Sequence, residues 1–275
     1  MRRPSLHHLT VLEASPFELT SIAAAIESPA ICIFANLPRP EFQFPALDLS
    51  SRHEMASCLA ATGTTISNVE FFWIEPEMAF DRFRRPMELG AFLRAKRIVV
   101  HIHDELIQRA VDNFGRLCDI ADDFKLSVGL EFMRFTPGCD SLEKAVGIVR
   151  AAGRKNAGVA IDALHLARTG GTPAQVANLD RALIGYGQLC DAPEQMPKER
   201  QLYEAMEERM IPGTGALPIA ELVAALPPDT DLDLEVPLKA MRLQGRTALE
   251  RAQLAMSGAM RILESASGQT HNLPK

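Results

Sequence analysis

The chain repeats one pattern, a short apolar run followed by a segment with helical spacing. The clearest runs are residues 128–133 and 157–165, and each carries a carboxylate near its C-terminal end. Short runs of β-branched and aliphatic residues predict strands that are buried on both faces. Strands that alternate with helices predict a parallel sheet.

Eight such units can be counted. We expect strands at residues 5–12, 30–35, 64–74, 97–103, 128–131, 157–162, 184–188 and 232–235. We expect helices from residue 16 and at 50–61, 86–95, 104–124, 141–152, 173–179, 218–226 and 245–265, with a further helical stretch at 198–209. Eight units in 275 residues predict a (β/α)8 TIM barrel, with a lid insertion at 191–215 after strand seven.

The alternative fold is a doubly wound open sheet. It is disfavoured because no G-x-G-x-x-G motif follows the first strand and no P-loop occurs. No interdomain linker is evident, so we expect one domain over residues 1–275, with a core at about 5–265 and a polar tail at 266–275.

Composition narrows the function classes. The formal net charge of −6 argues against binding to nucleic-acid phosphates. No apolar run approaches the roughly 18 residues that a membrane span needs, so we expect no membrane partner. The five cysteines are odd in number and lack C-x-x-C spacing. They predict reduced thiols, and with no signal peptide evident we expect a cytoplasmic protein.

Polar side chains close four consecutive strands: Glu131, Asp162, Gln188 and Glu235. In a barrel they would converge at the C-terminal ends of the strands, where active sites lie. A single one of them could be a solvated carboxylate, but three carboxylates close together repel one another and favour a cation. We therefore expect one divalent metal ion. Oxygen ligands favour Mn2+ first and Mg2+ next, with Co2+ and Zn2+ as further candidates.

Other polar residues near the strand ends are candidates for substrate binding: His165, His103, Trp73, Lys198, Arg200 and Arg209. His165 lies just beyond strand six and could donate to a substrate oxygen. The cations of segment 191–215 could equally form a solvated helix face, and Trp73 could pack against a lid. We interpret His101 as a packing residue of the barrel interior or mouth.

These motifs together resemble the xylose-isomerase-like barrel superfamily of sugar phosphate isomerases and epimerases. The resemblance covers about residues 5–265 and rests on Leu130-Glu131, Asp162-Ala-Leu-His165, Gln188-Leu-Cys-Asp191-Ala-Pro, Ile211-Pro-Gly-Thr-Gly215-Ala-Leu-Pro218 and Leu234-Glu235-Val-Pro. It implies that Glu131, Asp162, Gln188 and Glu235 bind one divalent metal. It also implies that the two glutamates move the substrate proton. We expect Glu131, Glu235 and His165 to be the catalytic residues, with His165 as a donor to a substrate oxygen.

The chain departs from the epimerases at Gln188, where they have histidine. The bacterial 3-dehydroshikimate dehydratases are similar in using glutamine there. The DNA-repair endonuclease branch is less similar, because it needs more histidines at strand ends. The resemblance therefore implies an isomerase or epimerase that acts through a metal-stabilised enediolate, with a lyase of the dehydroshikimate or inosose dehydratase type as the alternative. The expected partner is a small polyhydroxy carbonyl substrate, and a homodimer is left open.

Overall fold

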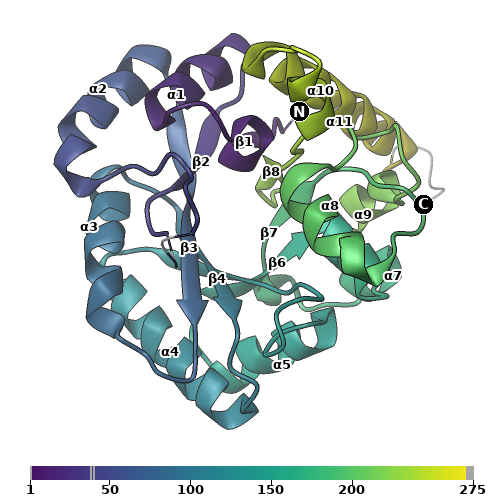
Figure 1. Ribbon diagram of the computed structural model, residues 1–275. Coiled ribbons are helices and arrows are strands. Elements are labelled where there is room, and N and C mark those ends of the chain that lie inside the picture. The colour runs from purple at the N-terminus through teal and green to yellow at the C-terminus, as the bar shows by residue number, and fades with distance from the viewer. Residues whose placement is uncertain (1, 38, 40, 271–275) are drawn as a thin grey trace.

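Eight parallel strands close into a barrel in the order β1 to β8, and helices surround it (Figure 1). The computed structural model describes residues 2–37, 39 and 41–270. The strands are β1 (Ser5–His7), β2 (Ala30–Phe34), β3 (Thr65–Ile74), β4 (Arg97–Ile102), β5 (Ser127–Glu131), β6 (Ala157–Asp162), β7 (Ile184–Leu189) and β8 (Leu232–Leu234). The predicted TIM barrel is confirmed.

The helices follow the strands in sequence. They are α1 (Pro16–Ala25), α2 (Arg52–Thr62), α3 (Arg84–Phe92), α4 (Ile107–Asp123), α5 (Leu142–Ala152), α6 (Ala163–Arg168), α7 (Pro173–Ala177), α8 (Gln201–Glu207), α9 (Ile219–Ala225), α10 (Lys239–Leu243) and α11 (Ala248–Thr270). Short 3-10 helices are η1 (His8–Val11), η2 (Leu49–Ser51), η3 (Phe80–Phe83), η4 (Arg181–Leu183) and η5 (Lys198–Arg200). None of the helices in the described part of the chain has the length and apolarity needed to cross a membrane.

The strands place apolar and polar side chains on opposite faces. Alternate residues such as Val128 and Leu130 belong to the main apolar core, together with residues of the surrounding helices. The positions between them face the barrel axis, because side chains along a strand alternate in direction. There Tyr186 packs against small residues. A Cβ at Gly129 would lie 2.7 Å from the Tyr186 ring, so glycine leaves room for the tyrosine.

The first strand is shorter than we expected. It ends at His7, and residues 8–11 form η1. The His7 side chain explains this change, because its Nδ1 accepts the Leu9 N–H at 3.1 Å and so caps the 3-10 helix. At the other end of the chain, α11 extends past the expected limit of residue 265 to Thr270, and residues 271–275 lie outside the described residues.

The segment at 191–215 is anchored by buried ionic contacts. Arg168 on α6 contacts Glu204 on α8 at 2.7 Å, and both side chains are buried. The Asp191 carboxylate accepts the N–H groups of Gly213 and Gly215 at 2.9 and 2.8 Å, which ties the end of the segment to its start. A lid role for this segment stays a prediction.

Candidate active site

Three side chains meet at the C-terminal ends of β5 and β6. Glu131, Asp162 and His165 offer ligand atoms that lie within 4.8 Å of one another, and all three residues are buried. We call them the Glu131 group. Asp162 caps α6, because its Oδ1 accepts the His165 N–H at 2.7 Å. This cap turns the first helical turn back over the strand end and brings His165 Nε2 to 3.6 Å from Glu131 Oε1.

His101 holds the other oxygen of Glu131. Its Nε2 lies 2.8 Å from Glu131 Oε2, and both residues are buried. Burial, together with the charges of Asp162 and Glu70, raises the pKa of Glu131 well above its usual range. Burial also lowers the pKa of His101 to about 4. In the metal-free protein this pair is therefore neutral, and His101 is more than the packing residue we expected.

Arg209 lies between two of the predicted metal ligands. One guanidinium nitrogen is 2.8 Å from Asp162 Oδ2, and the other is 2.9 Å from Glu235 Oε1. Its Nε donates to the carbonyl of Ala205 on α8, so the segment after β7 carries this cation to the strand ends. Burial would raise the pKa of Asp162, but Arg209 holds it below its usual value. Arg209 thus lies at the strand ends, and its role in substrate binding stays a prediction.

Gln188 and Glu235 are the other two predicted metal ligands. Gln188 Nε2 donates to Glu235 Oε2, while the buried Gln188 Oε1 has no hydrogen-bond partner among the described residues. Burial raises the pKa of Glu235 to about 8, although Arg209 opposes the shift. A buried amide oxygen without a partner, next to carboxylates that resist ionisation, fits a divalent cation. Glu131 and Asp162 lie with His165 in one cluster of metal-ligating types, and the free Gln188 Oε1 is a further oxygen donor, so these residue types fit a divalent metal ion. Metal binding by all four predicted ligands together stays a prediction.

The remaining predicted substrate residues fall into two places. His103 follows β4, and its ring centre lies 4.3 Å from that of Trp73 on β3. Lys198 and Arg200 lie in η5 with exposed side chains, and Arg200 packs over the Tyr203 ring. Their roles in substrate binding stay predictions.

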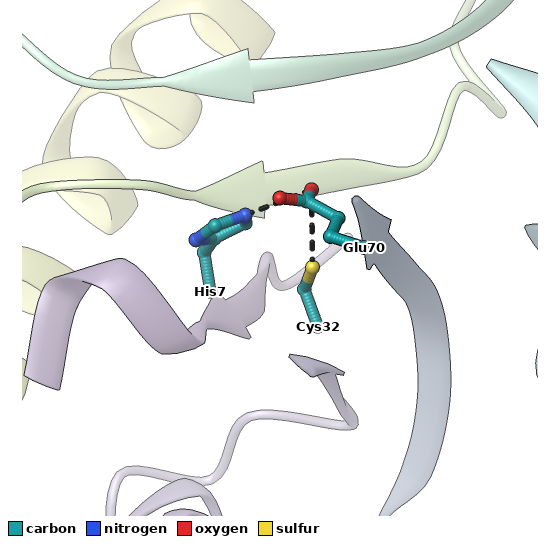
Figure 2. Close-up of side chains that lie close together, drawn as sticks. All are labelled: His7, Cys32 and Glu70. Atoms are coloured by element: carbon teal, nitrogen blue, oxygen red, sulfur yellow. Dashed lines mark hydrogen bonds and ion pairs between the residues drawn. The ribbon is translucent and has the colours of Figure 1, made fainter. Parts of the chain in front are cut away.

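A second cluster, which was not predicted from the sequence, lies on the β1–β3 side of the barrel and consists of His7, Cys32 and Glu70 (Figure 2). We call it the Glu70 group. His7 Nε2 lies 2.9 Å from Glu70 Oε1, and Cys32 Sγ donates to the same oxygen at 3.3 Å. One signal was available, because Glu70 is a lone carboxylate inside an otherwise apolar stretch of residues 69–74.

Comparisons with known proteins agree with the fold. A sequence model described as xylose isomerase-like TIM barrel matches residues 22–239. No curated protein sequence matches the chain. A solved xylose isomerase-like TIM barrel/4-hydroxyphenylpyruvate dioxygenase fusion protein is similar, with 20% identity and a TM-score of 0.81. The match covers 99% of this chain but only 45% of the fusion protein.

Two other similar structures match over almost their full length. The IolI protein with a bound zinc atom is 20% identical, with 96% of this chain and 99% of that chain covered and a TM-score of 0.80. The probable 3-DHS dehydratase AsbF from Bacillus anthracis is 14% identical, with 94% and 99% covered and a TM-score of 0.72. D-psicose 3-epimerase and L-ribulose 3-epimerase are also similar, with TM-scores of 0.71 and 0.74. At these identities the likeness shows the fold alone.

Proposed function

This chain belongs to the xylose isomerase-like TIM-barrel family, and we propose that it is a divalent-metal-dependent isomerase or epimerase of a sugar or sugar phosphate. The observation that carries the proposal is the meeting of Glu131, Asp162 and His165 within 4.8 Å. The buried Gln188 Oε1 without a partner supports it. The zinc atom in the similar IolI structure adds support for a metal, though not for its identity.

The expected ligands are Glu131, Asp162, Gln188 and Glu235, with Mn2+ favoured. A bound divalent ion would supply Lewis acidity, which makes the proton next to a substrate carbonyl easier to remove. Glu131 and Glu235 come from different strands and so approach a substrate from different sides. One removes the proton and the other returns it. Return to the opposite face gives an epimer, and return to the neighbouring carbon gives an isomer.

His165 and Arg209 would orient the substrate. Burial lowers the pKa of His165 to about 4, so at neutral pH its ring is uncharged and can donate one hydrogen bond to a substrate oxygen. Arg209 is always protonated. Its guanidinium is fixed by ion pairs with Asp162 and Glu235. It can therefore donate a hydrogen bond only to a substrate oxygen that lies beside these two carboxylates.

A test uses the full chain loaded with Mn2+, Mg2+ or Co2+. Ketoses, inososes and 3-dehydroshikimate are incubated with it in D2O and followed by NMR. We expect metal-dependent deuterium exchange next to the carbonyl of at least one ketose, and a new sugar signal. No exchange with any compound under any metal would contradict the proposal.

The second candidate is a lyase of the dehydroshikimate or inosose dehydratase type. Gln188 favours it, because the resemblance gives glutamine at this position to the dehydratases and histidine to the epimerases. The likeness to the probable dehydratase AsbF is consistent with it. In the same screen, loss of water with a new vinylic proton signal would identify this reaction.

A further inference from the structure

Arg209 is a fixed cation on two of the proposed metal ligands. Its side chain is 1% exposed, and its Nη1 and Nη2 lie 2.8 Å from Asp162 Oδ2 and 2.9 Å from Glu235 Oε1. Nε donates to the Ala205 carbonyl at 3.0 Å, and Nη1 also lies 3.6 Å from Cys190 Sγ. All three nitrogens are therefore engaged, and these contacts hold the planar guanidinium in one position.

Every oxygen of these two carboxylates already accepts a hydrogen bond from the protein. Asp162 Oδ1 accepts the His165 N–H at 2.7 Å. Glu235 Oε2 accepts from Gln188 Nε2. Arg209 takes the second oxygen of each carboxylate. A metal that binds Asp162 and Glu235 must therefore share an oxygen with one of these donors or displace it. Arg209 is the donor that serves both carboxylates, and it alone among the three carries a charge.

The guanidinium also stands between the proposed ligands. Glu131, Asp162 and His165 have ligand atoms within 4.8 Å of one another, but Glu235 is not part of that group. Metal–oxygen bonds are about 2.0–2.6 Å long, so an ion on either oxygen that Arg209 contacts would lie within roughly 5.5 Å of a guanidinium nitrogen. Two cations this close repel strongly where water is excluded. One ion therefore cannot bind Asp162 and Glu235 without opposing Arg209.

The segment after β7 has anchors other than the Arg209 side chain. Arg168 on α6 lies 2.7 Å from Glu204 on α8, and it also donates to the Pro193 carbonyl at 2.7 Å. The backbone at Arg209 is held as well, because its N–H donates to the Pro237 carbonyl at 2.8 Å. Glu204 is not a proposed metal ligand. What distinguishes Arg209 from Arg168 is therefore the pair of carboxylates that it contacts.

We propose that Arg209 competes with the divalent metal for Asp162 and Glu235 and thereby sets the metal affinity of the site. Without metal it pairs the two carboxylates, and a bound metal weakens at least one of these ion pairs. The metal is then held less tightly than the three carboxylates alone would hold it, so it exchanges with the solution. This inference rests on the proposed function, because it takes the metal ligands from it.

The test measures Mn2+ binding to the chelator-treated full chain by calorimetry. Arg209→Gln removes the charge and should bind Mn2+ at least about tenfold more tightly than the wild type. The size follows because a charge within about 4–6 Å changes the affinity of a site for even a single proton about tenfold to a thousandfold. Arg209→Lys keeps the charge and should stay within a few-fold of the wild type. A purely structural role for Arg209 predicts the opposite, weaker binding in Arg209→Gln.

Arg168→Gln is the matched control. It removes a buried guanidinium that anchors the same segment, but its partner Glu204 is not a proposed ligand. Mn2+ should therefore bind to it as to the wild type or more weakly. An equal gain in Arg168→Gln would overturn the inference, because loosening of the segment would then explain the effect. Unchanged or weaker binding in Arg209→Gln, or an equal gain in Arg209→Lys, would overturn it as well.

A measurement on the wild type does not depend on how well a variant folds. In protein labelled with 15N-arginine, NMR follows the exchange of guanidinium N–H protons with water, and Arg209→Lys assigns the Arg209 signal. Saturating Mg2+ should speed this exchange at Arg209, because its ion pairs weaken, and should leave Arg168 unchanged or slower. Bound Mg2+ that slows the exchange at Arg209, or does not alter it, would overturn the inference.

These outcomes keep the two proposals apart. Tighter Mn2+ binding in Arg209→Gln, without deuterium exchange of any carbonyl compound in the wild type, would support the inference and reject the proposed function. Metal-dependent deuterium exchange in the wild type, with unchanged Mn2+ affinity in Arg209→Gln, would do the reverse. Absence of Mn2+ binding in both proteins would reject both proposals.

Discussion

The Glu131 group and the Glu70 group look alike and behave differently. Each brings three metal-binding residue types within 4.8 Å, and each contains a buried glutamate hydrogen-bonded to a histidine, at 2.8 and 2.9 Å. Yet the pKa of Glu131 is raised and that of Glu70 is lowered. Burial favours the protonated form of both carboxyls. The charges of Asp162 and Glu70 add to this effect at Glu131, whereas His7 outweighs it at Glu70.

This difference teaches that residue types and distances do not identify a metal site. The position of each proton matters as well. In the Glu70 group, the Glu70 carboxylate already has two hydrogen-bond donors, His7 and Cys32. The Glu131 group and Glu235 bring three carboxyl groups beside one cation, Arg209, and the pKa values of Glu131 and Glu235 are raised, which is the arrangement that the proposed metal would stabilise. Four predictions test this contrast.

The largest effect is expected on turnover. Glu131→Gln should lower kcat by about a hundredfold or more, the usual contribution of a positioned proton-transfer group, while metal stays bound through the amide oxygen. Glu235→Gln should do the same. The variant that keeps the abstracting base should still exchange deuterium into substrate. Glu54→Gln, which changes an exposed carboxylate on α2, is the control and should leave kcat unchanged. Full activity in both Glu131→Gln and Glu235→Gln would place the proton chemistry elsewhere.

Metal should stabilise the fold through the proposed ligands Glu131, Asp162, Gln188 and Glu235, and not through the Glu70 group. At a metal concentration of about 100 times Kd, binding adds roughly 2.7 kcal/mol to the free energy of unfolding. Thermal melts with Mn2+ or with a chelator should show this gain in the wild type and in Cys32→Ala. Asp162→Asn should lose it. A gain that disappears in Cys32→Ala instead would assign the metal to the Glu70 group.

Metal affinity should rise with pH. Burial raises the pKa of Glu235 to about 8 and raises that of Glu131, so both carboxyls must lose protons before they can bind a metal. The affinity should therefore increase between pH 6 and 8, by up to about tenfold per pH unit for each proton released. Titrations at three pH values in two buffers of different ionisation enthalpy would count the protons. A flat profile would mean that the carboxylates are already ionised.

The smallest effect is expected at Gln188. If its free Oε1 is a ligand, Gln188→Ala should weaken metal binding about tenfold, roughly 1.4 kcal/mol. Gln188→His should keep the metal and shift the preference towards Zn2+ and Co2+, because imidazole suits these ions. Unchanged affinity in the alanine variant would show that Gln188 faces substrate or solvent.

The sequence by itself determined the barrel and the placement of Glu131, Asp162, Gln188 and Glu235 at one end. Both follow from local periodicity. Alternating strands and helices predict a parallel barrel, and a polar residue that ends a buried strand must face the mouth. The same local reasoning placed His165 correctly beside Asp162, because the two are three residues apart at a helix start.

Only the tertiary structure decided what these residues touch. Glu70 was missed because His7 lies 63 residues away and Cys32 lies 38 away, and only closure of the barrel makes them neighbours. Arg209 reaches Asp162 and Glu235 because the segment after β7 folds back along Asp191. Protonation also depends on such contacts. The pKa of each group depends on its burial and on charged residues that are distant in sequence but close in space. Neither can be read from the order of the residues.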